Sequence, residues 1–431
     1  MLKTLVNAWK TPELKRKIVI TLVIVLLYRL GACIPVPYID GVSLSADMLK
    51  NSAGTIFGYL NQLSGQAFSQ ATLFALSVSP YITAQIVIQL LTVAIPALER
   101  LSKDGQEGKR KINKIIRILT VVLAVVTAYG YYTYLDAQGY VVANPDHPWF
   151  SALVAIACYC AGASLIMWLA EKIDENGIGN GISIILFVNI LSSGYSTAMT
   201  LYYQIQRGGF LNIFFAILSV VMMVGIITLT VFITNSERRI PIQYAKRVVG
   251  RKMYGGQNSN LPLKLNMSGV MPIIFANSIV ALPATINMFV KNPGKIWSTI
   301  VGWFSPTSFI YVAIFICLIV AFAYFYIAIS FNTVEVSNNL KKNGGFIPGI
   351  RPGKPTSDYV KMVLNRITLV GALFLAFIAG LPIIINICAS GYLGALTFGG
   401  SSILIVVGVA LETARELESQ MAMRHYKGFL E

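Results

Sequence analysis

The chain has 431 residues, of which 55% are hydrophobic and only 12% are charged, and its 34 Lys and Arg against 18 Asp and Glu give a formal net charge of +16. Soluble globular domains carry about 25% charged residues, and the mean hydropathy here is +0.67. The composition therefore excludes a water-soluble protein and indicates an integral membrane protein.

The apolar residues fall into continuous runs that are long enough to cross a bilayer as helices. A hydrocarbon core about 30 Å thick needs roughly 20 apolar residues per helix. Membrane β-strands would instead alternate apolar and polar residues over about ten positions. We therefore predict an all-α polytopic protein with ten transmembrane helices, at about 15–34, 72–95, 112–135, 149–170, 178–203, 210–234, 268–290, 306–330, 364–386 and 399–418.

Lys and Arg are unevenly divided between the segments that join these spans. If both termini are cytoplasmic, the inner segments hold the basic stretches 100–117, 238–264 and 341–366, whereas the outer segments hold only four Lys or Arg. This bias follows the positive-inside rule, and two cytoplasmic termini agree with an even number of spans. The basic face reflects topology alone, or it is a docking surface for RNA, anionic lipid or an acidic protein patch.

The stretch before the second span, residues 55–76, is too polar to face lipid. Its sequence, TIFGYLNQLSGQAFSQATLFAL, interrupts a mildly apolar pattern with Gly, Asn, Gln and Ser. Such a segment is tolerated at membrane depth only where it is buried in protein or lines a cavity. We therefore predict a short helix that re-enters the protein from the outer side, and a cavity that receives it.

Residues that could carry chemistry are scarce. The five cysteines lie in or beside apolar runs without zinc or disulfide spacing, and the two histidines leave no plausible triad, so we predict no catalytic residue, metal or cofactor. Arg29 and Glu412 are the ionisable residues within the spans. They either mark a transport pathway or face neighbouring helices and bond to carbonyls. This scarcity argues against a proton-coupled transporter and favours a conduit over an enzyme.

Two spans begin with a similar pattern. In the second, Ile82 follows Pro80 by two residues, and Ile86 lies one turn further along the same face. In the seventh, Ile274 follows Pro272 in the same way. The second and seventh spans correspond if the ten helices are two repeats of five, and an odd number of helices per repeat makes the repeats inverted.

The basic segment 341–356, KKNGGFIPGIRPGKPT, lies between two long apolar runs. Its three prolines cannot donate backbone hydrogen bonds, and each restricts the residue before it. We therefore expect a shaped loop that stands clear of the bilayer on the cytoplasmic side.

Six segments carry a more specific pattern: PYITAQIVIQLL, GIGNGISII, RRIPIQYAKRVVGRK, LPLKLNMSGVMPIIFA, NNLKKNGGFIPGIRPGKPT and FGGSSILIVV. In order and along the whole chain, they resemble the SecY/Sec61-alpha family, the channel-forming subunits of the Sec protein translocase. The resemblance implies an hourglass channel of two inverted five-helix halves, residues 1–205 and 206–431. It also implies a protein-conducting channel that passes unfolded preproteins and releases apolar segments laterally into the bilayer.

The resemblance further implies which residues form the channel. Members of the family have a plug helix that closes the outer funnel, which matches residues 57–71, and an aliphatic ring at the waist. Their lateral gate opens between spans two and three on one side and seven and eight on the other. The matching positions are Phe57, Leu60, Leu63, Ser64, Gly65 and Phe68 for the plug, Ile82, Ile86, Leu186, Ile190, Ile274 and Ile405 for the ring, and Val87, Ser278 and Leu282 for the gate.

The resemblance implies partners as well. Loops 235–266 and 331–363 match the loops that receive the SecA ATPase or the ribosome, and the basic residues there could also contact rRNA. SecE and SecG are the expected membrane partners, signal-bearing preproteins the cargo, and membrane lipids the surroundings of the gate. The implied location is the bacterial cytoplasmic membrane, with both termini cytoplasmic. The matching contact residues are Arg351, Arg238, Arg239, Lys246 and Arg247.

Two other classes of protein fit the apolar composition. A ten-span secondary transporter would also have inverted repeats and broken helices, and saturable uptake of a small solute would identify it. A membrane scaffold would transport neither a solute nor a polypeptide.

Overall fold

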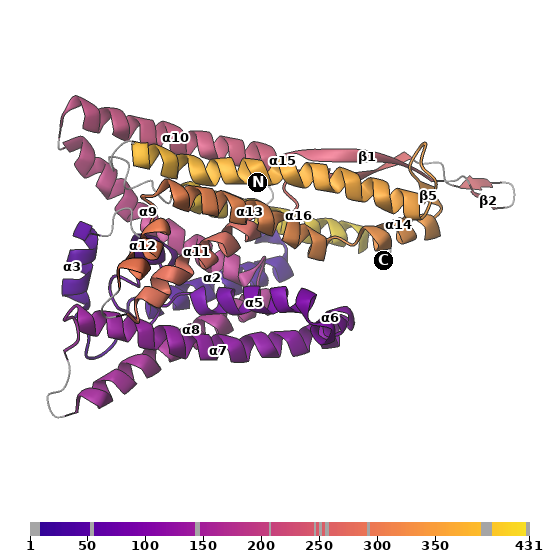
Figure 1. Ribbon diagram of the computed structural model, residues 1–431. Coiled ribbons are helices and arrows are strands. Elements are labelled where there is room, and N and C mark those ends of the chain that lie inside the picture. The colour runs from indigo at the N-terminus through magenta and orange to yellow at the C-terminus, as the bar shows by residue number, and fades with distance from the viewer. Residues whose placement is uncertain are drawn as a thin grey trace.

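A computed structural model describes residues 9–51, 56–142, 147–206, 208–244, 247–249, 252–254, 258–290, 294–388 and 399–427. Each of the ten predicted spans coincides with a helix in this part of the chain (Figure 1). Five of these helices have Pro in their first turn, where the missing N–H needs no partner. The ten helices are α2 (Pro12–Gly31), α5 (Ser79–Ala94), α7 (Gly105–Ala137), α8 (Pro148–Asn176), α9 (Gly181–Gln206), α10 (Phe210–Asn235), α11 (Met271–Asn287), α13 (Phe309–Ser330), α15 (Lys354–Cys388) and α16 (Gly399–Lys427).

By length and hydropathy alone, six of the described helices are long and apolar enough to cross a membrane, or up to seven when the bent pair α5 and α6 (Pro96–Lys103) counts as one span. Helix α2 falls short because four Lys or Arg lie among its 20 residues. Helix α11 has only 17 residues, and α16 turns polar from Glu412 onward. The structure therefore supports a polytopic helical membrane protein without confirming all ten spans individually.

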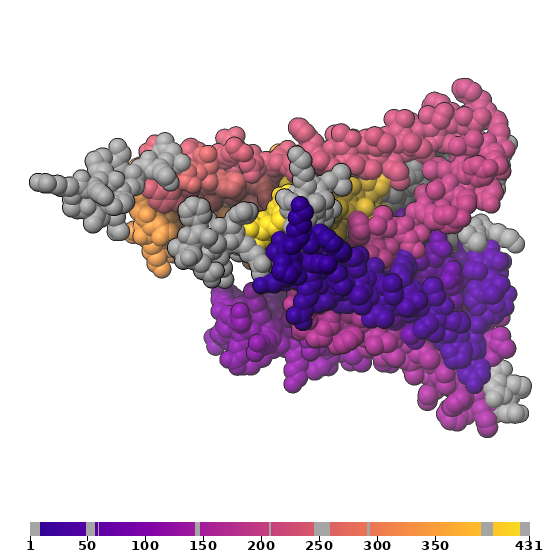
Figure 2. Space-filling model, turned by 180° about the vertical axis from the view of Figure 1, so that it is seen from behind, coloured from indigo at the N-terminus to yellow at the C-terminus, as the bar shows by residue number. Residues whose placement is uncertain are grey.

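The helices form two groups that lie side by side (Figure 1). In one group α7 packs against α5 and α8, and α2 against α8; in the other α15 packs against α13 and α16, and α10 against α16. The groups meet where α9 contacts α10 and α16, and where α5 contacts α11. Seen from behind, the indigo and purple residues of the first group lie below the pink helix α10 of the second (Figure 2).

Shorter helices connect the long ones. Helix α6 bends away from α5 by 102°. The remaining short helices are α3 (Gly41–Asn51), α4 (Ile56–Leu63), α12 (Lys295–Trp303) and α14 (Thr333–Lys342).

The predicted re-entrant segment contains less helix than its sequence suggested. Helix α4 covers only 56–63, and 64–78 continues as turns into α5. The backbone has positive φ at Gly65, Gln66, Ala71 and Ser77, a conformation that ends a helix. Contacts of α4 with α9 and α11 place it between the two groups of helices.

A small sheet projects from one end of the molecule, and hydropathy gave no sign of it. Strands β1 (Glu237–Tyr244) and β4 (Asn258–Lys264) pair antiparallel, and β5 (Gly345–Phe346) adds to the other edge of β1. A two-stranded extension, β2 (Arg247–Val249) and β3 (Lys252–Tyr254), continues the hairpin. Ile240 and Leu263 point inward and pack in a cluster with Val360 and Leu364 of α15, so the hairpin is fixed to a long helix.

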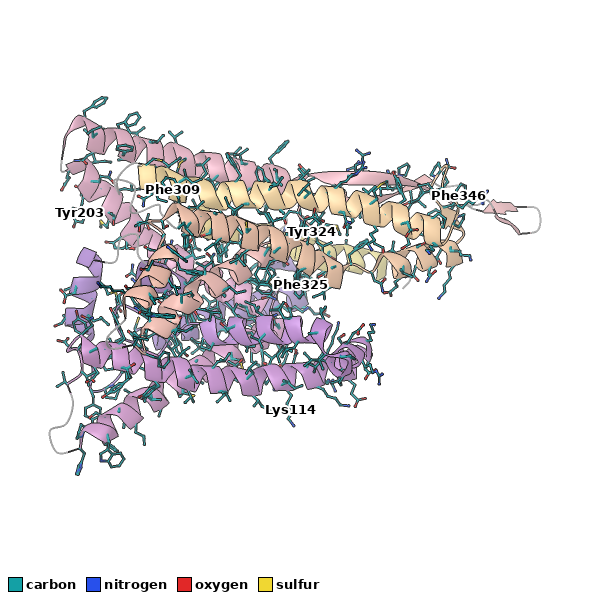
Figure 3. All side chains as sticks on the ribbon, in the orientation of Figure 1. Lys114, Tyr203, Phe309, Tyr324, Phe325 and Phe346 are labelled. Carbon is teal, nitrogen blue, oxygen red and sulfur yellow. The ribbon has the colours of Figure 1, made fainter. Side chains whose placement is uncertain are left out.

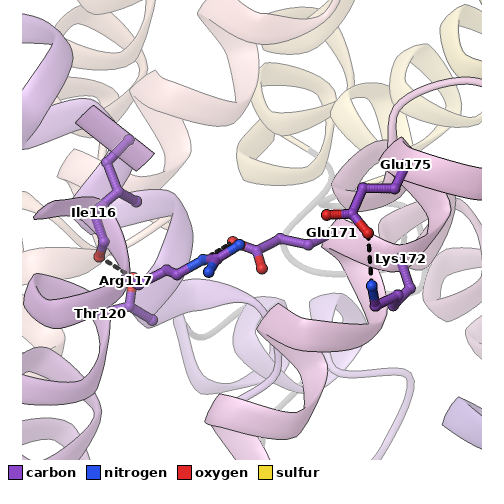
Figure 4. Close-up of polar contacts among 6 residues, drawn as sticks. All are labelled: Ile116, Arg117, Thr120, Glu171, Lys172 and Glu175. Atoms are coloured by element: carbon purple, nitrogen blue, oxygen red, sulfur yellow. Dashed lines mark hydrogen bonds and ion pairs between the residues drawn. The ribbon is translucent and has the colours of Figure 1, made fainter. Parts of the chain in front are cut away.

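An ion pair joins α7 to α8. Arg117 Nε lies 2.7 Å from Glu171 Oε1, and a second pair on α8 links Lys172 to Glu175 at 2.6 Å (Figure 4). Because the side chain of Glu171 is only 15% exposed, this pair is more protected from water than a usual surface contact.

The outer faces of the helices carry exposed apolar side chains, as lipid contact requires. On α10, Val221 is 62% and Phe232 70% exposed. Aromatic residues such as Tyr203 and Phe309 lie at one end of the helices, and Phe346 of β5 at the opposite end (Figure 3). The chain is therefore a multi-pass membrane protein.

Candidate functional site

The six residues predicted to form the ring lie together in the interior. They come from α5, α9, α11 and α16, each exposes 7% or less of its surface, and all belong to one buried apolar cluster. Burial of side chains from four helices in one cluster is what a collar between the two groups of helices requires. That these six residues form the constriction of a pore stays a prediction. The six are Ile82, Ile86, Leu186, Ile190, Ile274 and Ile405.

A cavity of about 200 Å³ adjoins this ring. The ring residues Ile82, Leu186, Ile274 and Ile405 line one part of it. A second cavity, of about 280 Å³, lies beside Ile190. Other predicted positions also line the first cavity, namely Leu60 and Leu63 of α4 and Ser278 and Leu282 of α11.

The predicted plug residues divide between α4 and the turn after it. Phe57 stacks on Phe68 at 6.2 Å between ring centroids and on Tyr134 at 5.0 Å. Ser64 and Phe68 are buried, and the Tyr131 hydroxyl donates to the Phe68 carbonyl at 2.6 Å. The segment therefore fills the space beside the ring and is not a free surface loop.

The gate positions lie along the junction of the two groups. Ser278 and Leu282 are on α11, and Val87 is on α5, which contacts α11. Leu282 is 41% and Val87 37% exposed, so both reach the outer surface. Val87 is not among the residues that line the cavity. Its only link to Ser278 and Leu282 in the structure is the contact between α5 and α11.

The two ionisable residues of the spans do not meet. Arg29 donates to the carbonyls of Gly65 at 3.5 Å and Val188 at 3.2 Å, which is the carbonyl-bonded alternative considered above. Glu412 lines a separate cavity together with Lys264. In the described part of the chain, no group of three or more His, Cys, Asp and Glu is placed to hold a metal ion.

Two buried asparagines near the ring were not predicted. Asn277 lines the cavity, and Asn189 hydrogen-bonds the carbonyl of Leu63 at 2.7 Å. Each is a single amide within an apolar run, and a polar side chain at membrane depth is a signal of function. That signal could have identified both.

The predicted docking residues lie at the end of the molecule that carries the sheet. Arg238 and Arg239 are exposed on β1, and Arg351 is exposed in the turn before α15; we call these three residues the docking surface. Arg239 pairs with Glu237 at 2.7 Å. Lys246 lies outside the described residues, and Arg247 is in β2.

The two loops that carry the docking surface are joined through the backbone. Gln243 and Tyr244 of β1 pair with Phe346 and Gly345 of β5. The hairpin is also anchored at its base, where Arg415 of α16 donates to the Thr234 carbonyl and to Asn235 Oδ1, both at 2.7 Å.

Lys264, at the end of β4, lies in the cavity that Arg415 also lines. Burial, together with the neighbouring Arg415 cation, lowers the pKa of its ammonium group. The base of the hairpin is therefore a partly enclosed charged site, unlike the exposed surface above it.

Known proteins resemble the chain along its whole length. The SecY family model matches residues 72–414. The protein translocase subunit SecY of Streptomyces coelicolor is 43% identical over 448 residues, and that of Mycobacterium bovis 40% over 447, each alignment covering 100% of both chains.

Solved structures share the fold. A protein-conducting channel superposes with a TM-score of 0.68 at 18% identity, covering 94% of this chain and 92% of the other. Sec61 in a canine ribosome–channel complex superposes with a TM-score of 0.64 at 16% identity, with the same coverage. On these sequence matches, the chain belongs to the SecY family.

Proposed function

We propose that this chain is the protein-conducting channel of a bacterial Sec translocase and not an enzyme. It passes unfolded preproteins across the cytoplasmic membrane and releases apolar segments laterally into the bilayer. The single observation that carries the proposal is the convergence of four ring residues, two residues of α4 and two gate residues on one cavity, in a chain of the SecY family.

The ring acts as a seal that a polypeptide can deform. Aliphatic side chains give an ion no ligands to replace its hydration shell, so a narrow apolar constriction resists ion flow. The same side chains make few hydrogen bonds with any passing sequence, so many different polypeptides can cross. In the resting channel, α4 and the following turn act as the plug beside this ring.

Lateral release follows from partitioning between the channel and the lipid. A Leu-like residue gains roughly 0.3–0.6 kcal/mol on insertion, and one central charge costs about 2.5–3.5 kcal/mol. A few charges therefore decide whether a segment is secreted or inserted. We place the exit between α5 and α7 on one side and α11 and α13 on the other, with Val87, Ser278 and Leu282 beside it.

The docking surface receives the partner that drives transport. A structural neighbour is Sec61 in a canine ribosome–channel complex, which supports the ribosome as a partner of this chain; SecA is the proposed ATPase. We place the sheet and both termini on the cytoplasmic side, and SecE and SecG beside the channel in the membrane. The halves 1–205 and 206–431 are proposed as the inverted repeats.

Reconstitution with SecE, SecA and ATP tests this function. Vesicles that contain the complex should protect a signal-bearing precursor from added protease, whereas the same precursor without its signal should stay accessible. If no precursor is protected while a small solute accumulates saturably, the chain is a secondary transporter and the proposal is wrong.

A further inference from the structure

The carboxyl end of α4 is held by polar side chains of its neighbours. The helix ends at Leu63, and the backbone then turns at Gly65 and Gln66, whose φ values are 63° and 75°. Carbonyl groups in the last turn of a helix have no partner within the helix. The side chains that bond these carbonyls therefore decide how firmly the segment is held.

Two of these side chains belong to α9. Asn189 Nδ2 donates to the Leu63 carbonyl at 2.7 Å, and one turn later Ser193 Oγ donates to the Gln62 carbonyl at 3.3 Å. Ser77, which precedes α5, donates to the same Leu63 oxygen at 3.1 Å. Asn189 is fully buried, so its bond is made where water cannot replace it.

Arg29 of α2 completes the attachment. Its guanidinium donates to the carbonyl of Gly65 and to that of Val188 in α9, and a cation is favourable at the carboxyl end of a helix. The packing is close, because a Cβ on Gly65 would lie 2.9 Å from Arg29 Nη1 and 3.0 Å from Asn189 Oδ1. A larger residue there would have to displace the Arg29 guanidinium and would be strained by the positive φ.

The same face of α9 carries the ring. Leu186, Asn189, Ile190 and Ser193 follow one another at helical spacing, so two ring residues alternate with two residues that hold α4. A movement of α9 that widens the ring therefore also pulls on the end of α4. Beyond the turn, Tyr131 still holds the Phe68 carbonyl, which fixes the rest of the segment.

We propose that Asn189 is a latch that couples the ring to the plug. It keeps α4 closed through the Leu63 carbonyl, and displacement of α9 by an entering polypeptide breaks this bond and frees α4 to swing about Gly65 and Gln66. The proposal rests on the plug role given above.

A labelling experiment on the reconstituted complex tests the latch. In a background without native cysteines, Leu60→Cys reports on α4, and its reaction with a membrane-impermeant maleimide is timed. Asn189→Leu keeps the size of the side chain but removes the donor, so labelling should accelerate about fivefold or more. Ser193→Ala removes only the longer bond to the Gln62 carbonyl, so it should accelerate labelling less.

Two matched controls separate a latch from general loosening. Asn386→Leu removes another buried asparagine, on α15, and should leave the labelling of Leu60→Cys unchanged. Val126→Cys lines the same cavity from α7, and its labelling should not respond to Asn189→Leu.

The outcomes separate the latch from the channel function. Wild-type labelling of Leu60→Cys in both α9 variants, or equal acceleration at both reporter cysteines, would overturn the latch. Precursor transport is measured in the same type of vesicle with the chain that carries neither an α9 variant nor a reporter cysteine, so it does not depend on the labelling result. A lack of precursor transport would overturn the proposed function and not the latch.

Discussion

The ring and the docking surface are built by opposite rules. The ring gathers six buried aliphatic side chains from helices far apart in the sequence, and we propose that it seals the channel by offering an ion nothing to bind. The docking surface presents exposed cations on a strand and a turn whose loops are joined by the β1–β5 pairing, and we propose that it binds its partner by charge. A polar side chain should therefore impair the seal at the ring, and a charge reversal should impair partner binding at the docking surface.

The largest effect is expected from charge reversal on the docking surface. Arg351→Glu should reduce SecA-driven transport about 100-fold or more, because like charges placed together at an interface cost several kcal/mol. The variant should still assemble with SecE. Lys295→Glu, the same change on exposed α12, should transport normally; normal transport by Arg351→Glu would refute the docking role.

Polar substitutions in the ring should let ions leak through the closed channel. Replacing Ile82 and Ile86 with Asn gives ions and water groups to bind, so resting conductance should rise several-fold or precursors with defective signals should be accepted. Single-channel recording and transport of signal mutants measure the two effects. Ile88→Asn on the same helix, buried in a different cluster, should destabilise the protein without opening it. Unchanged conductance and selectivity would remove Ile82 and Ile86 from the ring.

The base of the hairpin should matter less than its tip. Arg415→Ala removes two charge-assisted hydrogen bonds, one partly buried and one exposed, but acts on docking only through the position of the sheet. We expect SecA to bind about tenfold more weakly. Glu416→Ala, whose carboxylate accepts from Gln420 on its own helix, should bind SecA normally; equal binding by both variants would show that the base does not position the sheet.

The smallest effect is expected from the ion pair between α7 and α8. Arg117 is 51% exposed, so Arg117→Gln should lower stability by about 1 kcal/mol or less, seen as a small fall in the unfolding temperature. Lys111→Gln breaks the more exposed ion pair between Lys111 and Glu107, so it should lower the unfolding temperature even less. A loss of transport in Arg117→Gln would contradict this expectation, because it would show that the ion pair has a role in transport and not only a small one in stability.

The sequence predicted the long helices better than the contacts between them. Each continuous apolar run coincides with a helix in the described part of the chain, because burial in lipid imposes the same demand along the whole helix, although only six or seven of these helices are long and apolar enough to count as spans by themselves. The ring was located by resemblance alone, since hydropathy cannot tell Ile274 inside a collar from an isoleucine between helices. The helix after residue 55 proved shorter than expected, because the turn at Gly65 and Gln66 depends on side chains from α2 and α9.

The sheet and the latch were missed for different reasons. Strand β1 alternates buried and exposed residues over a short stretch within a basic loop, and its pairing with β5 joins segments about a hundred residues apart. No local pattern encodes that contact. Asn189, in contrast, was visible as a lone amide in an apolar run, but its partner is a backbone carbonyl, which leaves no trace in side-chain identity.

The central claim, that a polypeptide passes through the ring, has a direct test. With Ile274→Cys in a cysteine-free chain and one cysteine in a precursor stalled by a folded domain, we expect a disulfide to form between the two cysteines. Val221→Cys, on the outer face of α10, should form none. Cross-linking at Val221→Cys, or protected precursor without any cross-link at Ile274→Cys, would place the path outside the ring.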